Sequence, residues 1–461
     1  MSDAGIPLAA GDRPDRAAGT GALGHALGAV LLAATLVFYF VSTNPFVDLT
    51  AAASVDPATD QSNTLNQLVF LSLTGGLWLF ALASPMRGEI AQPRALLAAV
   101  TLWFLAASAV SDHPDLAIKR TVLAILTCVN ASVIVFLPRS EARFARILTA
   151  CVALTLAVAY LGVLFLPNLS IHQFSELREP MNAGLWRGHF THKNAASTVM
   201  VMISFIGLYA FRRGLRLVGA TVFVLAVVFL LHAGGKTATA ALPAILLMSW
   251  MFERWRLLRI PLVIGGVAAI NTMTLGSATV PAIRDLVAAL GIDPTFTNRS
   301  DIWKIGVDAV AQKPVFGHGF QLFWQTGDMV YRAGRGEDWA AAAYNGHNAY
   351  LDSAITTGIP GLILTLLFVI VVPLRGLVRS PATRYTPLSK LYVDIWLYGL
   401  FTACVESILF SSGSVLWFMM LVAIAGLRLQ GRADPVDDTG RAPRLPSGAA
   451  PERKAHDGRN A

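Results

Sequence analysis

Long apolar runs separated by short polar connections extend through most of the chain. Many of these runs reach the roughly 20 residues that an α-helix needs to cross a bilayer. They predict spans at 24–43, 66–84, 95–111, 121–138, 147–167, 194–211, 217–232, 238–252, 260–283, 348–373, 391–410 and 414–428. The pattern therefore predicts an all-α polytopic membrane protein with about twelve transmembrane helices.

Composition and charge agree with this interpretation. The chain of 461 residues is 55% hydrophobic and only 14% charged, whereas soluble domains carry about 25% charged residues. Most Lys and Arg residues behind the net charge of +8 fall in every second connection, as the positive-inside rule predicts. We therefore attribute the basic charge to topology rather than to nucleic-acid binding, and we expect both termini in the cytoplasm.

One long polar segment interrupts the apolar pattern between the ninth and tenth spans. A connection of roughly sixty residues is far longer than an ordinary loop, so we expect it to be functional. The predicted organisation is a cytoplasmic tail at 1–23, nine spans within 24–283, an extracytoplasmic loop at 284–347, three spans within 348–428 and a disordered cytoplasmic tail at 429–461.

Cysteine usage adds no covalent framework. Cys128, Cys151 and Cys404 all lie inside apolar runs and have no paired spacing. We expect them to be small buried residues rather than disulfide partners or metal ligands.

Basic and aromatic residues gather where the chain enters the sixth span. The stretch 185–194 lies at an outer membrane interface. Within about two helical turns it contains Arg187, His189, His192 and Lys193. One alternative is that Trp186 and Lys193 only anchor the interface. The spacing of His189 and His192 could seat a metal, but a third ligand is not evident, so metal binding is the weaker interpretation.

A second basic position follows the seventh span. The turn Ala233-Gly-Gly-Lys-Thr237 places Lys236 on the same outer side. Its sequence is similar to a nucleotide-binding loop but lacks the upstream glycine and a preceding strand. Nucleotide binding is therefore rejected.

The long loop offers a third group of candidates. Arg299 is expected to open a short amphipathic helix at 299–311, where a merely solvated arginine is the alternative. The stretch Pro314–Phe320 predicts a glycine-containing turn in which His318 is structural. His347 lies where the loop enters the tenth span, and Asn348 and Tyr350 follow it along a helix start. A histidine at such a boundary is either a plain interfacial residue or an acid or base near neutral pH.

Five motifs in order resemble the O-antigen ligase and exopolysaccharide polymerase family of bacterial inner-membrane proteins. They are Arg187-Gly-His-Phe-Thr-His-Lys-Asn194, Gly235-Lys-Thr-Ala238, Asn298-Arg-Ser-Asp-Ile-Trp303, Pro314-Val-Phe-Gly-His-Gly-Phe320, and His347-Asn-Ala-Tyr-Leu351 with Thr357-Gly-Ile-Pro-Gly361. The span count and the long penultimate outer loop match as well. The resemblance covers roughly 65–428 and is closer to the exopolysaccharide-production branch.

The resemblance implies an inverting, metal-independent glycosyltransferase without a cofactor. It would transfer a glycan from a polyprenyl-diphosphate carrier to an acceptor hydroxyl at the periplasmic face of the inner membrane, and the loop at 284–347 would be periplasmic. Polymerisation of exopolysaccharide is the first expectation, and O-antigen-type ligation is the alternative. The expected partners are the lipid-linked donor, a glycan or lipid acceptor, the bilayer and other polysaccharide export or biosynthesis proteins, but no nucleic acid.

Residue roles follow from the same resemblance. His347 would take the proton from the acceptor hydroxyl. Arg187 and Arg299 would bind the diphosphate, because guanidinium groups bind phosphate oxygens in pairs, and Lys236 and Lys193 would support them. The candidate glycan contacts are His192, Asn194, Trp303, Asn348 and Tyr350. Trp186, Trp303 and Trp324 could each stack on sugars or anchor the interface.

A transporter or flippase is the alternative from another functional class. It would require charged residues at mid-membrane depth, and the candidates are Asp394 and Glu406 in the eleventh span at 391–410. Charge gathers instead at one outer surface, which favours interfacial catalysis.

Overall fold

The computed structural model describes residues 22–50, 64–138, 140–176, 179–324, 326, 340, 343–379 and 386–432. Within these ranges the chain is helical, apart from turns and one isolated antiparallel bridge between Ile171 and Trp186. The predicted all-α class is confirmed. Almost all of the two predicted cytoplasmic tails, and residues 327–339 of the long loop, lie outside the described residues.

Eight helices in the described part of the chain are long and apolar enough to cross a membrane. They are α1 (Ala22–Val41), α2 (Thr64–Ala83), α4 (Pro114–Ile134), α5 (Glu141–Phe165), α7 (Lys193–Arg212), α8 (Arg216–Ala233), a segment ending in α10 (Gly266–Thr279), and one beginning with α14 (Ala349–Leu366) and continuing into α15 (Val372–Arg379). The chain is a multi-pass membrane protein.

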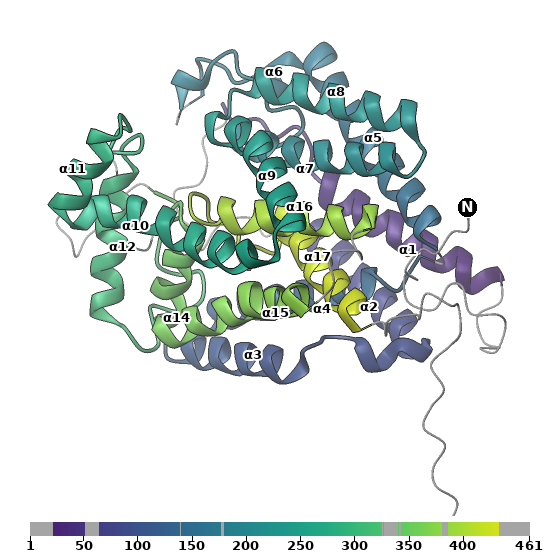
Figure 1. Cartoon of the computed structure of the whole chain (residues 1–461), viewed down its shortest axis with the longest axis horizontal. Coiled ribbons are helices and arrows are strands. Elements are labelled where there is room, and N and C mark those ends of the chain that lie inside the picture. Colours follow the sequence, from purple (N-terminus) through teal and green to yellow (C-terminus); the bar gives the residue numbers. More distant parts are fainter. Residues whose placement is uncertain are drawn as a thin grey trace, which may run out of the picture.

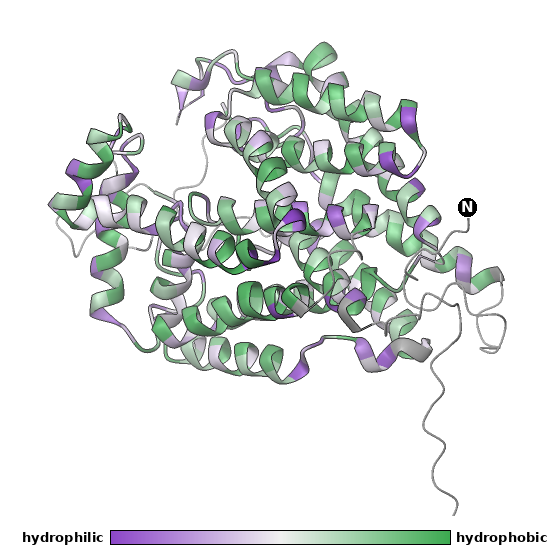
Figure 2. Cartoon of the chain, viewed as in Figure 1, coloured by the Kyte–Doolittle hydropathy of each residue, from purple (hydrophilic) through white to green (hydrophobic). Residues whose placement is uncertain are grey.

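Four further helices complete the set of expected runs. They are α3 (Arg94–Ala109), α9 (Lys236–Arg254), α16 (Pro387–Thr402) and α17 (Val415–Arg432). Each of the twelve predicted runs therefore overlaps a helix, while the exact number of spans stays a prediction. In Figure 2 the helices of the bundle are mainly hydrophobic along their length.

Close packing between α7 and α8 depends on two glycines. A Cβ at Gly207 would lie 2.8 Å from the backbone nitrogen of Phe223, and one at Gly219 would lie 2.4 Å from that of Phe211. Small residues at such crossings let helix backbones approach closely, which is how membrane helices gain contact without a hydrophobic driving force.

The long loop folds into a helical lobe at one end of the bundle. Figure 1 shows α11 (Pro281–Ala289) and α12 (Arg299–Gln312) at the end of the bundle opposite α1. The predicted helix at 299–311 is confirmed as α12. The ninth span, expected to reach residue 283, ends at Thr279, because Val280 is extended and Pro281 starts a new helix.

The lobe has its own small core, which attaches it to α14. Trp303 and Ile302 of α12 pack in one cluster with Leu351 and Ile355 of α14. Because this core is shared between loop and membrane helix, it holds the start of α14 against α12.

A break in α14 receives the turn that precedes it in the chain. Gly358 has φ 71° and ψ 179°, a conformation that is essentially restricted to glycine. The main-chain groups freed by this break bond to the predicted Pro314–Phe320 turn. The bonds run from His318 N to Ile355 O (2.9 Å), from Gly319 N to Thr356 O (3.1 Å) and from Ile359 N to Pro314 O (2.8 Å).

Candidate functional site

His347, Glu406 and Arg299 form one connected group beside the start of α14. The His347 Nδ1 atom lies 3.3 Å from Glu406 Oε2, and Arg299 Nη2 donates to Glu406 Oε1 at 3.0 Å. The exposed fractions of the three side chains are 29%, 25% and 21% in that order. An imidazole, a carboxylate and a guanidinium are therefore joined where solvent or a substrate can reach them.

The helix cap next to His347 fixes its position. His347 has φ 45°, which is uncommon for a residue other than glycine. The Asn348 side chain caps α14 by accepting from the backbone nitrogens of Tyr350 and Leu351. The same side chain donates to Cys404 O at 2.9 Å, so the cap also ties this helix start to the segment after α16.

Glu406 does not lie within a membrane helix. The expectation that the eleventh span includes residues 391–410 is wrong, since α16 ends at Thr402. The carbonyls that follow bond to the start of α14 instead, with Ala349 N donating to Ala403 O at 2.8 Å. Sequence reasoning had therefore missed Glu406 as a site residue, although a lone acid in an apolar stretch was a usable signal.

The surroundings of Glu406 favour its ionised form. Burial alone would raise the pKa of this carboxyl, but the hydrogen bond with His347 and the charge of Arg299 outweigh it and hold the pKa below its ordinary value. The carboxylate is thus available to orient His347 through Nδ1, which leaves Nε2 for a substrate.

A left-handed turn presents Arg299 to this group. Phe296, Thr297 and Asn298 all have positive φ, and each such residue costs about 1–2 kcal/mol when it is not glycine. Asp293 supports the turn by accepting from Thr295 N at 2.9 Å and Thr297 N at 3.3 Å. The bond from the Thr295 backbone contributes most to a lowered pKa of Asp293.

Asp352, in the first turn of α14, connects the long loop to the segment that contains Glu406. Its carboxylate accepts from Trp324 Nε1 at 2.8 Å and from Gly346 N at 3.0 Å, and it also accepts from the Ser407 hydroxyl. Asp352 thereby holds Gly346, the residue before His347, close to Ser407, the residue after Glu406.

Three of the candidate glycan contacts are packed inside the protein. Trp303 is fully buried and donates to Gly346 O at 2.9 Å. Asn348 is the buried cap, and the buried Tyr350 donates its hydroxyl to Leu400 O at 3.0 Å. In this conformation these side chains support the site rather than face a substrate.

The two lysines extend the positive charge of the site. Lys193 starts α7, and Lys236, which is exposed, starts α9. The Lys193 ammonium interacts electrostatically with Lys236, Arg299 and Glu406. Lys193 and Lys236 are thus close enough to Arg299 and Glu406 for their charges to act together, and the predicted role of the lysines in binding a diphosphate stays a prediction.

Arg187 occupies a different environment. It is fully buried, and its guanidinium donates to Val47 O at 2.7 Å and to Phe190 O at 3.1 Å. These bonds fasten the segment after α1 to the loop before α7. Arg187 Nε has no hydrogen-bond partner within the described residues.

His192 and His189 point to different partners. His192 caps α7 by accepting from the backbone nitrogen of Asn194, which is half-buried, and its Nε2 lies 3.0 Å from Glu179 Oε2. The hydrogen bond with His192 is the main cause that lowers the pKa of Glu179 to about 2. The His189 ring instead bonds to Phe40 O at 2.9 Å. In the part of the chain that the structure describes, no group of three or more His, Cys, Asp or Glu is arranged to hold a metal ion.

Comparison with known proteins relates one region of the chain to a protein family. Residues 220–366 match the family described as O-antigen ligase, and this region includes Lys236, Arg299 and His347. The predicted resemblance is confirmed: about a third of this multi-pass membrane protein is similar to that family.

A particular relative extends this result. Over 110 residues the chain is 30% identical to the exopolysaccharide production protein ExoQ of Rhizobium meliloti. This alignment covers 22% of the chain and 23% of the relative, so the matching segment spans less than a quarter of that protein's length.

Proposed function

We propose that this protein is a glycosyltransferase of the bacterial inner membrane that polymerises an exopolysaccharide from polyprenyl-diphosphate-linked units. The observation that carries the proposal is the His347–Glu406–Arg299 group at the outer end of the bundle. His347 can accept a proton, the Glu406 carboxylate can orient the His347 ring, and the Arg299 cation can bind a phosphate leaving group. On this proposal both termini are cytoplasmic and the loop at 284–347 is periplasmic.

The reaction needs one proton transfer and one displacement. His347 Nε2 takes the proton from the acceptor hydroxyl while that oxygen attacks the anomeric carbon from the face opposite the diphosphate. The bond between the anomeric carbon and the diphosphate oxygen breaks, and the lipid diphosphate leaves with the electron pair. The new glycosidic bond has the inverted configuration, and this route requires neither metal nor cofactor.

The charged residues have complementary parts in this mechanism. Glu406 stabilises the imidazolium that forms when His347 is protonated. Arg299, Lys193 and Lys236 neutralise the charge that develops on the departing diphosphate. Arg187 has a structural part, because it joins the segment after α1 to the loop before α7.

A second candidate is ligation of a completed glycan to a lipid or another acceptor. The match to a family described as O-antigen ligase favours ligation. The similarity to ExoQ, an exopolysaccharide production protein, favours polymerisation. The two reactions share the chemistry above and differ only in the acceptor. The transport alternative loses support, because Glu406 belongs to the site and not to a span.

Glycan analysis of a deletion strain tests the proposal. The strain is complemented with wild type, with His347→Ala, or with His113→Ala as a control at an exposed histidine before α4. A lost base typically costs about 10²–10⁴-fold in rate, so His347→Ala should abolish polymer and accumulate lipid-linked repeat units, whereas His113→Ala should restore polymer.

Each other outcome has a definite meaning. Polymer that is built but never attached to its acceptor would indicate a ligase. Normal polymer with His347→Ala, at normal protein levels in the membrane, would remove His347 from the mechanism.

A further inference from the structure

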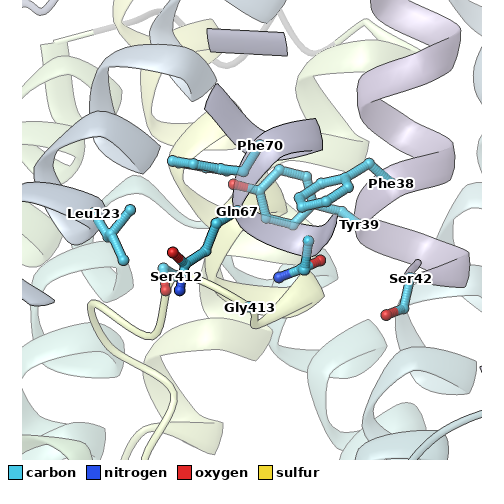
Figure 3. A pocket seen from close by; sticks show the side chains of 9 residues that line it. Phe38, Tyr39, Ser42, Gln67, Phe70, Leu123, Ser412 and Gly413 are labelled. Atoms are coloured by element: carbon cyan, nitrogen blue, oxygen red, sulfur yellow. The ribbon is translucent and has the colours of Figure 1, made fainter. Parts of the chain in front are cut away.

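A small pocket lies between α1, α2, α4 and the segment that follows Glu406. Its volume is about 160 Å³. A cavity of roughly 150 Å³ holds one benzene-sized ring, so the pocket has room for one sugar ring. Figure 3 shows aromatic side chains of α1 and α2 on one side and the 412–413 turn near the Gln67 side chain.

The lining combines an aromatic wall with polar groups. Phe38 packs against Tyr39 and Phe70, with ring centroids 5.3 and 6.2 Å away. Tyr39 is buried and stacks on Phe418 with the ring centroids 3.8 Å apart, which holds this wall in place. Gln67 and Ser412 line the same space from α2 and from the turn.

This lining fits a neutral sugar better than a lipid chain or a phosphate. Aliphatic chains would leave the amide and hydroxyl groups without partners, which is costly in a buried site. A phosphate would find no cation, because every residue that lines the pocket is uncharged. A sugar ring offers hydroxyls to the amide and a C–H face to the aromatic wall.

The pocket is also close enough to the catalytic group to share a substrate with it. Ser412 follows Glu406 by six residues, and six residues span at most about 20 Å. On the other side, the segment after α1 is bound to Arg187 through Val47 O.

We propose that this pocket binds one neutral sugar residue of the acceptor glycan. The inference rests on the proposed glycosyltransferase function and adds to it a place where the acceptor is recognised. The donor diphosphate lies with Arg299 and the lysines, and the acceptor chain extends from His347 to the pocket.

Two substitutions in separate elements test the proposal. Gln67→Leu removes the amide at similar size. Gly413→Leu adds a bulky side chain at a residue that lines the pocket, and a Cβ there meets no atom within 4 Å. Gly75→Leu, also open around its Cβ and on the same helix as Gln67, is the matched control outside the pocket.

The kinetic assay uses purified protein in nanodiscs with lipid-linked repeat units as donor and, as acceptor, the oligosaccharide released from the carrier by mild acid. Loss of one hydrogen bond should raise the acceptor KM roughly two- to tenfold in Gln67→Leu. Gly413→Leu should raise it at least as much, and kcat and the donor KM should not change. Gly75→Leu should match wild type.

A binding assay separates the two proposals. Saturation-transfer NMR titrations with the same oligosaccharide should show binding to His347→Ala with the wild-type Kd, and a Kd roughly two- to tenfold higher in Gln67→Leu. Unchanged acceptor KM and unchanged binding in both pocket variants would overturn the pocket proposal while the transferase stands. Absence of transfer by wild type would instead overturn the proposed function, and a co-purified lipid released by Gly413→Leu at constant acceptor KM would show that the pocket is a lipid site.

Discussion

Replacing Glu406 with glutamine isolates the role of its charge. Glutamine keeps the size of the side chain and one oxygen that can accept from His347 Nδ1. In the wild-type protein this nitrogen lies 3.3 Å from Glu406 Oε2. It removes the negative charge that stabilises the protonated base and that pairs with Arg299 at 3.0 Å. The substitution therefore affects the transition state more than the shape of the site.

The magnitude follows from the distance. Unit charges 3.3 Å apart interact by about 5 kcal/mol at an effective dielectric constant of about 20. Because about a quarter of each side chain is exposed to solvent, screening should reduce this interaction to roughly half, about 2.5 kcal/mol, which Glu406→Gln removes. Each 1.36 kcal/mol is a factor of ten in rate, so kcat should fall roughly 10²-fold.

The assay is transfer from lipid-linked donor in nanodiscs, with kcat and both KM values measured. Glu253→Gln is the matched control, because Glu253 forms a similarly half-buried ion pair with Lys390 at 2.7 Å on the other side of the bundle. Glu406→Asp retains the charge and should lose less activity than Glu406→Gln. A kcat for Glu406→Gln within threefold of wild type, in a protein of unchanged melting temperature, would refute the orienting role.

Three further predictions follow from the geometry. Arg299→Lys should reduce kcat at least 10²-fold, because the guanidinium bonds to Val405 O and Glu406 through two different nitrogens and an ammonium cannot reproduce this planar fork. The control is Lys304→Gln, on the exposed face of the same helix, and equal kcat values for the two variants would contradict the reasoning. Gly358→Ala should lower the free energy of unfolding by roughly 3 kcal/mol or more and the melting temperature by several degrees, since its Cβ would lie 1.9 Å from Val315 O in the loop. Gly376→Ala, with open space at its Cβ, should leave the melting temperature unchanged. Equal melting temperatures for the two variants would show that the break in α14 tolerates a side chain. The lowered pKa of Glu406 predicts a stability contribution that is complete above the ordinary value of 4.5 and is lost as the pH falls through the lower folded-state pKa. The melting-temperature difference between wild type and Glu406→Gln should therefore not shrink between pH 7 and 5, and it should shrink in more acid buffer. A difference that shrinks above pH 5 would mean that the carboxyl is not held ionised.

The sequence was sufficient for features that depend on local pattern. Hydropathy located the helices, because burial in a bilayer requires long apolar runs. The position of Arg299 at the start of α12, and of His347 just before α14, followed from where the polar pattern changes to an apolar one. These residues belong to the region that matches the O-antigen ligase family.

Features that depend on distant contacts could not be predicted. Apolar residues on both sides of Glu406 continue the pattern of a span, whereas the chain leaves the helix because its next carbonyls bond to the start of α14. Asp293 and Asp352 carry no motif, and their importance comes from the backbone nitrogens that they bind. The burial of Arg187 likewise depends on carbonyls from a segment 140 residues earlier.

The junction between the long loop and α14 has a consequence for how proteins of this type diversify. Three of the bonds between the Pro314–Phe320 turn and the break in α14 use main-chain atoms only. The close approach there depends on small residues, since a Cβ at Gly317 would lie 2.6 Å from Ile355 O. The register of the loop is therefore independent of most of its side chains. Those side chains can be exchanged while His347 keeps its place, and a loop transplanted between two related proteins with its glycines intact should retain its alignment with the membrane helix.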